Sequence, residues 1–315
     1  MLRYRLVFGT LMIGLLLLVF WADARLDHVP VEGTLLESWF GRRYLPAGLL
    51  LLCLLVVVMA LTSAELHRFF LAKGADISRS MTIIAGSTGC VLVYAAPASM
   101  TSHETIALFA TVLVLVFLAS LLRHSWGGVV EGSLHAGGAA VFAFVYLGTL
   151  PGFYLLLRRW NTPWLIVALI LITKSCDIGA YFTGRALGRH KLIPWLSPGK
   201  TWEGLIGGLM FSGLVGVGLA ALGNHFQPML PPLVTDASLA TLHWPVPLWY
   251  AALAGVIMGG VGQLGDLTAS LLKRDAGLKD SGRSIPGFGG LLDVVDSPIV
   301  VAPVAYWLVR LAPVG

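Results

Sequence analysis

Long apolar runs alternate with short polar stretches along almost the whole chain. A helix needs about 20 mainly apolar residues to cross the hydrocarbon layer of a bilayer. The runs that approach this length lie at residues 4–22, 44–63, 81–99, 105–122, 137–157, 162–181, 203–222, 247–265 and 297–312. Because only helices and closed barrels satisfy their backbone groups in lipid, the pattern predicts an all-α, polytopic integral membrane protein with about nine transmembrane helices.

Three of these runs need a closer look. The run at 81–99 is broken by Gly, Ser and Pro, and the run at 297–312 is short and contains Arg310. The first run follows Arg3 and Arg5 and precedes the triplet Ala22-Asp23-Ala24, so a cleaved signal peptide is an alternative to an uncleaved first helix. We expect the uncleaved helix, because the run is long for a signal peptide and another apolar run follows it.

Composition supports a membrane protein and excludes several other classes. Of the 315 residues, 57% are hydrophobic and 12% are charged, whereas a soluble domain has about 25% charged residues. Disorder and a disulfide scaffold are excluded by the apolar content and by the three cysteines. The net charge of +5 is spread in short basic pairs, so no nucleic-acid partner is expected.

No internal repeat or low-complexity linker is visible. We therefore expect one integrated membrane domain, with about five spans in residues 1–160 and the remaining spans in residues 161–315. Basic residues gather in cytoplasmic loops, and the loop at 223–246 has neither Lys nor Arg, which places it outside. The basic loops at 182–202 and 266–296 then face the cytoplasm. Nine spans would put the N-terminus outside, against Arg3 and Arg5, so its orientation and the exact number of spans stay open.

The scarce charges are concentrated in two late segments, of which the first is residues 266–296. It holds five of the 16 acidic residues of the chain, and all five are aspartates: Asp266, Asp275, Asp280, Asp293 and Asp296. Basic residues and glycines accompany them. Aspartate oxygens suit Mg²⁺, cations neutralise phosphate, and glycine lets backbone N–H groups approach a ligand. The segment indicates a metal and phosphate site at the membrane edge; a solvated loop is the alternative.

The second segment is residues 174–203. Lys174 and Asp177 lie three residues apart within an apolar run, hence on one helix face, where they form an ion pair or line a polar cavity. Residues 197–203 indicate a loop that enters a helix, with Ser197 or Thr201 as its cap. Lys200 beside this helix start indicates an anion site.

Three further polar residues, Glu65, His67 and Arg68, follow the second apolar run. Side chains of this kind at the end of a span usually reach into the interface while their stems stay in the apolar layer. We therefore interpret them as interfacial solvation.

Residues 270–296, SLLKRDAGLKDSGRSIPGFGGLLDVVD, resemble the signature of phosphatidate cytidylyltransferases, also called CDP-diacylglycerol synthases. Asp266 matches the acid that precedes this signature. Three upstream motifs match as well: Asp-x-Gly-Ala-Tyr from Asp177, Gly-Arg-x-x-Gly-Arg from Gly184, and Ser-Pro-x-Lys-Thr-x-Glu-Gly from Ser197. The resemblance covers residues 174–297, in the same order and at compatible spacing.

Two positions depart from the family pattern. Phe288 stands where the family has His, and Val294 stands where it has Arg. Both family side chains could contact phosphate, so the substitutions leave two interpretations: a divergent active enzyme or a catalytically impaired membrane homologue. We expect an active enzyme, because every acidic position of the pattern is present.

The resemblance implies an enzyme of phospholipid biosynthesis that transfers CMP from CTP to phosphatidate and gives CDP-diacylglycerol and pyrophosphate. It implies Mg²⁺ at Asp266, Asp293 and Asp296, with room for a second cation. Lys273, Arg274 and Lys279 would bind the triphosphate or the leaving pyrophosphate, and Asp280 would orient these bases or coordinate the metal as well. Phosphate contacts are implied for Ser197, Lys200 and Thr201, and a supporting or ligand role for Asp177. The protein would work in the inner (cytoplasmic) cell membrane with its active site facing the cytoplasm.

Three other functions are alternatives to this one. A nucleotide-dependent polyprenol or phytol-type lipid kinase would release a nucleoside diphosphate instead of pyrophosphate. A transporter would more often show two related halves, whereas the charges here lie in one half of the chain. A catalytically impaired homologue would have no turnover. The partners implied are CTP, phosphatidate and membrane lipid. The sequence leaves a homodimer open. It also leaves open the preferred acyl chains and the choice between CTP and dCTP.

Overall fold

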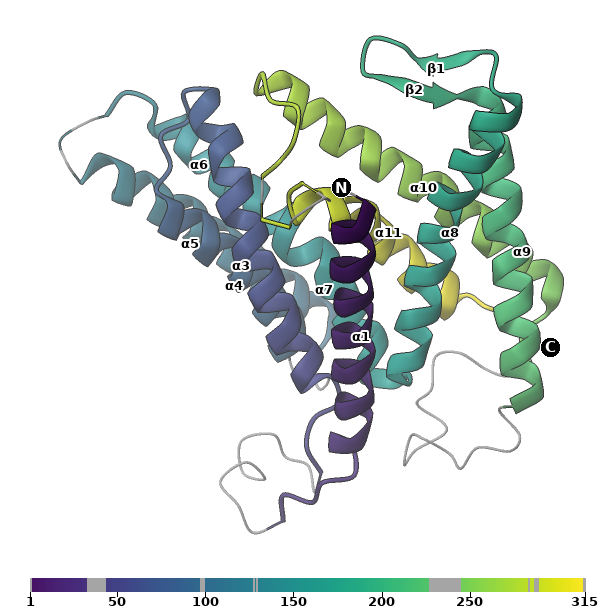
Figure 1. Ribbon diagram of the computed structural model, residues 1–315. Coiled ribbons are helices and arrows are strands. Elements are labelled where there is room, and N and C mark those ends of the chain that lie inside the picture. Colours follow the sequence, from purple (N-terminus) through teal and green to yellow (C-terminus); the bar gives the residue numbers. More distant parts are fainter. Residues whose placement is uncertain are drawn as a thin grey trace. The chain divides into compact units, whose positions relative to one another are not determined.

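A computed structural model describes residues 2–32, 44–96, 100–126, 128, 130–226, 245–282, 284–285 and 289–313, with side chains from residue 7 onward. Helices make up most of this part of the chain (Figure 1). They are α1 (Leu2–Leu26), α3 (Leu49–Ala72), α4 (Arg79–Ala95), α5 (Ser102–Ser125), α6 (Ser133–Ala143), the π-helical η1 (Phe144–Thr149), α7 (Leu150–Trp160), α8 (Pro163–Leu187), α9 (Trp202–Phe226), α10 (Leu248–Asp275) and α11 (Leu292–Arg310). The all-α prediction is confirmed.

Within the described residues, 8 helical segments are long and apolar enough to cross a membrane. One of them is the continuous run of α6, η1 and α7, which spans 28 residues. These eight coincide with eight of the predicted runs, so the chain is a multi-pass membrane protein. The remaining run, 81–99, overlaps α4, a helix of 17 residues that begins at Arg79, after its N-cap Ser78. It is shorter than the roughly 20 residues that a span needs.

The contacts divide the chain into two compact units. Unit 1 comprises Met1–Ile13, Leu51–Leu155 and Leu271–Val295, and unit 2 comprises Gly14–Leu50, Leu156–Ser270 and Asp296–Gly315. Helices α10 and α11 contribute to both units, because α10 leaves unit 2 after Ser270 and α11 enters it at Asp296. The predicted boundary near residue 160 stays a prediction. Most of the loop predicted to lie outside, residues 227–244, falls outside the described part of the chain.

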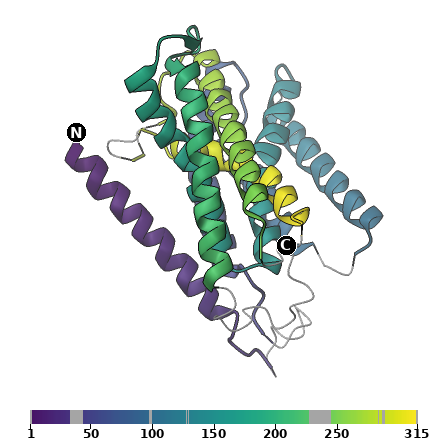
Figure 2. The ribbon, with the colours of Figure 1, turned by 90° about the vertical axis from the view of Figure 1, so that its right-hand side faces the viewer.

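Glycines bring the helices of unit 2 into close contact. A Cβ atom added at Gly208 of α9 would lie 2.6 Å from the carbonyl oxygen of Cys176 on α8. A Cβ at Gly216 would lie 2.6 Å from the carbonyl oxygen of Ala251 on α10, and Figure 2 shows α9 and α10 side by side. Small residues allow such close backbone approach in membrane helices, where packing replaces the hydrophobic driving force. The glycines of α9 therefore set the spacing of α8, α9 and α10.

The close contact at Gly208 predicts how a larger residue there would change stability. Gly208→Ala is expected to lower the free energy of unfolding by about 1–3 kcal/mol, because the new methyl group meets a carbonyl oxygen that cannot turn aside. Gly218→Ala on the same helix is the matched control, since no atom lies within 4 Å of the added Cβ. The control should be neutral or slightly stabilising, as alanine favours helix. Unfolding midpoints in detergent measure both, and equal midpoints would contradict the packing argument.

A short antiparallel hairpin joins α8 to α9, where a loop was predicted. Its strands are β1 (Lys191–Ile193) and β2 (Ser197–Thr201), with Lys191 opposite Thr201, and Figure 1 shows it at the end of the two helices. Of the two predicted caps, Thr201 caps α9, because its hydroxyl accepts a hydrogen bond from the backbone N–H of Gly204 at 3.1 Å. Ser197 instead lies in β2. The hairpin was missed because β2 contains Pro and Gly and lacks apolar alternation.

Candidate active site

A cavity of about 640 Å³, with charged side chains in its wall, lies within unit 2. Its wall comes from α8, the hairpin, the start of α9 and α10, and includes all four residues predicted to bind substrate: Asp177, Ser197, Lys200 and Thr201. Asp266, predicted as a metal ligand, lines the same cavity, and so do Arg185 and Gln263. Ligand pockets typically measure about 300–1,000 Å³, so the cavity has room for a small-molecule substrate.

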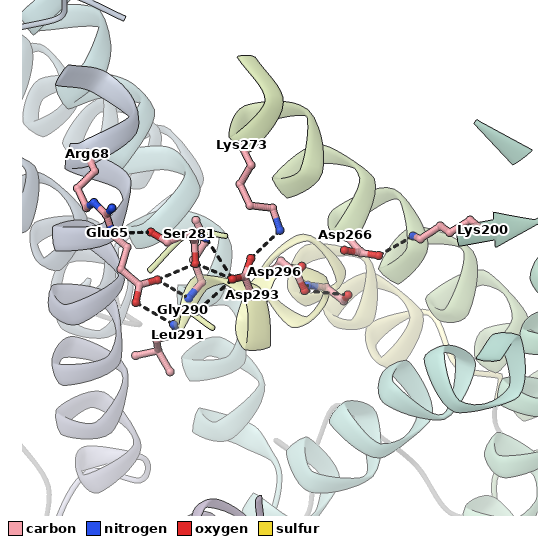
Figure 3. A network of polar contacts seen from close by, with 12 residues as sticks. Glu65, Arg68, Lys200, Asp266, Lys273, Ser281, Gly290, Leu291, Asp293 and Asp296 are labelled. Atoms are coloured by element: carbon pink, nitrogen blue, oxygen red, sulfur yellow. Dashed lines mark hydrogen bonds and ion pairs between the residues drawn. The ribbon is translucent and has the colours of Figure 1, made fainter. Parts of the chain in front are cut away.

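Lys200 is the central cation of this cavity. Its Nζ lies 2.6 Å from Oδ2 of Asp266 and 2.9 Å from Oε1 of Gln263, and Figure 3 shows it reaching Asp266. Gln263 in turn donates a hydrogen bond from Nε2 to Oδ1 of Asp177 at 2.7 Å. The buried amide of Gln263 thus connects the lysine to a second carboxylate. Sequence reasoning missed Gln263, although an amide in an apolar span one turn before Asp266 is itself a signal.

A second lysine, Lys174, joins Asp177 to the buried residue Asp296. Its Nζ lies 3.4 Å from Oδ2 of Asp177, which confirms the pair predicted from their spacing, and 3.7 Å from Oδ1 of Asp296. Asp296 also accepts hydrogen bonds from the backbone N–H and hydroxyl of Ser297. Among these linked side chains, three carboxylates face two lysines, which leaves an excess of negative charge.

A separate cluster in unit 1 is built around Asp293, in the first turn of α11. Lys273 Nζ lies 2.6 Å from its Oδ1, as Figure 3 shows. Its Oδ2 accepts hydrogen bonds from the backbone N–H of Ser281 at 3.2 Å, the Ser281 hydroxyl at 3.0 Å and the backbone N–H of Gly290 at 3.1 Å. Asp293 therefore joins Ser281 to Gly290, the two ends of a segment that we call the glycine-rich loop, and orients Lys273.

Glu65 of α3 belongs to the same cluster, and its interpretation as interfacial solvation was wrong. The residue is 4% exposed and accepts hydrogen bonds from the hydroxyls of Ser281 and Ser284 and from the backbone N–H groups of Leu291 and Leu292. The sequence signal was its acidic side chain within a run that forms one membrane helix, where a carboxylate is costly unless it is paired or hydrogen-bonded.

Comparison with known proteins identifies the family of this chain. The sequence profile described as "Cytidylyltransferase family" matches residues 33–312. The chain belongs to the cytidylyltransferase family. It is 34% identical over 213 residues to the phosphatidate cytidylyltransferase of Bacillus subtilis, covering 67% of this chain and 69% of that one. It is 31% identical over 285 residues to the phosphatidate cytidylyltransferase of Synechocystis, covering 82% and 87%. The Escherichia coli protein YnbB is 35% identical over 212 residues, 64% of each chain.

Some residues expected at the site of this cytidylyltransferase do not take part in the contacts described above. Arg274, Lys279 and Asp280 are exposed, and none of them takes part in the hydrogen bonds that hold Asp293 and Glu65. Phe288, at the position of the family His, lies outside the described residues. Val294, at the position of the family Arg, is half-buried in the first turn of α11. Of the basic residues predicted to bind triphosphate, only Lys273 is held by an ion pair to a predicted ligand, Asp293.

The three aspartates predicted to hold Mg²⁺ are divided between the two units of the cytidylyltransferase. Asp293 lies in unit 1, where lysine and loop donors surround it, whereas Asp266 and Asp296 lie in unit 2. Across the described ranges, no group of three or more His, Cys, Asp or Glu side chains is close enough to hold a metal ion. Mg²⁺ is commonly held by only one or two carboxylates together with substrate phosphates and water. Asp266 and Asp296, the two of these aspartates that lie in one unit, are compatible with that mode of binding.

Proposed function

We propose that the protein transfers CMP from CTP to phosphatidate and releases CDP-diacylglycerol and pyrophosphate. The observation that carries the proposal is the cavity of unit 2, where Lys200, two carboxylates and the hairpin residues Ser197 and Thr201 converge. The names of the bacterial relatives support the same reaction.

The chemistry suits such a cavity. An oxygen of the phosphatidate phosphate attacks the α-phosphorus of CTP, a new P–O bond forms, and the bond to the β-phosphate oxygen breaks as pyrophosphate leaves. The nucleophile is already an anion, so little general-base catalysis is needed. The main barrier is the approach of two polyanions, which positioned cations lower by neutralising charge in the transition state.

We assign roles to the residues accordingly. Lys200, with Ser197 and Thr201, binds phosphate oxygens, and Asp177 holds Lys200 in place through Gln263. Asp266 and Asp296 would hold Mg²⁺, which supplies Lewis-acid neutralisation of the phosphates when bound. In the other cluster Asp293 orients Lys273 toward the triphosphate or the leaving pyrophosphate. We propose the same ligand for Arg274 and Lys279, and the orientation of these bases for Asp280.

The proposed location follows from the two substrates. CTP is soluble in water and the acyl chains of phosphatidate stay in lipid, so the reacting phosphates meet at a membrane surface. Residues 182–202, which include the hairpin, carry Arg185, Arg189, Lys191 and Lys200 and no acidic residue, as expected for a cytoplasmic loop. We therefore place the cavity at the cytoplasmic side of the inner membrane.

The test is an assay of the purified protein in lipid–detergent micelles with phosphatidate and CTP labelled at the α-phosphorus. The expected result is label in the lipid, one pyrophosphate released per lipid labelled, and loss of turnover when EDTA removes divalent cations. With an added polyprenol, release of labelled CDP as the γ-phosphate passes to the polyprenol hydroxyl would identify a lipid kinase instead. Absence of any product with a folded protein would identify a catalytically impaired homologue.

A further inference from the structure

Glu65 is a buried carboxylate with four hydrogen-bond donors, all of them uncharged. One oxygen accepts from Ser284 and from the backbone N–H of Leu291 at 2.9 Å, and the other accepts from Ser281 at 3.0 Å and from the backbone N–H of Leu292 at 2.9 Å. Ser281 lies 216 residues later in the chain. A carboxylate removed from water keeps its charge only when hydrogen bonds replace its hydration, and these four bonds do so.

Two of these donors are at the N-terminus of α11. Leu292 is the first residue of this helix, and Leu291 precedes it. The first N–H groups of a helix have no partner within the helix, and the helix dipole favours a negative charge beside them. Leu291 has no side-chain oxygen with which to cap its own helix. Glu65 therefore caps α11 from α3, at the two residues directly before Asp293.

Gly282 and Gly290 of the glycine-rich loop lie so close to Glu65 that no residue with a side chain would fit at either position. A Cβ atom at Gly282 would lie 2.7 Å from Oε1 of Glu65, and a Cβ at Gly290 would lie 2.4 Å from its Oε2. Arg68, one turn along α3, donates a hydrogen bond to the carbonyl oxygen of Ser281 at 3.4 Å. Both ends of the loop are thus held against α3, as Figure 3 shows.

Ser281 connects Glu65 to Asp293. Its hydroxyl lies 3.0 Å from Oε2 of Glu65 and 3.0 Å from Oδ2 of Asp293, and its single proton can be donated to only one of them at a time. Its backbone N–H is donated to Asp293 in addition. Movement of the loop away from Glu65 would therefore disturb the groups that orient Asp293, and through it Lys273.

We propose that Glu65 is a positioning residue of the transferase: it holds Ser281, Leu291 and the start of α11 so that Asp293 and Lys273 keep their geometry. This role rests on the proposed function, because it concerns the rate of CMP transfer. Glu65 acts through Ser281 and α11 and does not touch substrate.

The test compares Glu65→Gln with Glu104→Gln in the full-length protein. Gln has nearly the same volume but carries an NH₂ group in place of one acceptor oxygen. Because each oxygen of Glu65 accepts from two donors, the NH₂ group would face donors in either orientation, and half of the cap on α11 would be lost. We expect kcat to fall about 10–100-fold, as for other residues that orient catalytic groups, with KM changed less than about threefold. Amide exchange at Leu291 and Leu292 should rise about tenfold. Glu104 is an exposed cap of α5, so its Gln variant should match the wild type.

A purely structural role would lower the amount of folded protein without changing kcat per active site or local exchange, and that result would overturn the proposal. Wild-type kcat and exchange in Glu65→Gln would also overturn it. If Glu65→Gln fails to fold, Ser284→Ala, which removes one donor from an exposed position, should still lower kcat about 2–5-fold and speed local exchange. If the wild type lacks transferase activity, the proposed function fails, whereas unchanged exchange in the variant would refute the positioning by Glu65 separately.

Discussion

Lys200→Met is expected to lower kcat/KM for CMP transfer by about 10²–10³-fold, the usual loss when one charge-stabilising donor is removed from an active site. Met keeps much of the length and the apolar stem of lysine but removes the ammonium group that contacts Asp266 and Gln263. Two effects add: the phosphates lose a cation, and Asp266 is left with an uncompensated charge in the cavity. The measurement is incorporation of α-labelled CTP into lipid at several CTP concentrations.

Lys191→Met is the matched control for this prediction. Lys191 lies on the other strand of the same hairpin, is exposed, and is not part of the cavity wall. Its replacement removes the same charge from the same segment, so a general electrostatic effect of the hairpin would appear in both variants. Similar turnover in Lys200→Met and Lys191→Met would contradict the role of Lys200.

Arg158→Met is expected to destabilise the protein by about 3–5 kcal/mol, the cost of leaving a buried charge without its partner. Arg158 Nε lies 2.6 Å from Oδ2 of Asp23, and the two side chains are 2% and 1% exposed. Its Nη2 lies 2.6 Å from Oδ2 of Asp27. Burial raises the pKa of Asp27, and Arg158 is the main group that opposes the rise. The change in the free energy of unfolding in detergent checks the prediction.

Two further variants separate the buried ion pair from other effects. Arg310→Met removes an exposed arginine from the last turn of α11 and should leave stability within about 0.5 kcal/mol of the wild type. Asp23→Asn combined with Arg158→Met should be more stable than Arg158→Met alone, because the double variant removes the stranded carboxylate charge. If the double variant is less stable than Arg158→Met, the stabilisation by Arg158 does not come from its ion pair with Asp23.

Local interactions were predictable from spacing. Lys174 and Asp177 were expected to pair because residues three apart share a helix face, and the structure pairs them. The cap of α9 was narrowed to two residues, of which Thr201 forms it. The helices were likewise expected, since the length and apolarity of a run decide whether it can span a bilayer. Each of these features depends on residues within a few turns of one another.

Long-range contacts were not predictable in this way. Glu65 looked like an interfacial residue because nothing near it in sequence explains its charge, and its partners begin 216 residues later. Asp23 appeared only in a triplet resembling a signal-peptide cleavage site, whereas its partner Arg158 is 135 residues away. The bond between Lys200 and Gln263 joins a hairpin to a helix 63 residues later. Sequence spacing carries no information on such pairs.

The residue pattern alone therefore specified that the chain lies in a lipid bilayer, where its helices are, which family it resembles and which residue types form the site. These follow from hydrophobicity and from local periodicity, which are properties of short segments. Only the tertiary structure decided which charges meet: Lys200 with Asp266 and Gln263 in one cavity, and Glu65 with the loop that holds Asp293 in a separate cluster. Buried charges in a membrane protein must find partners, and the packing of distant helices determines which partners are within reach.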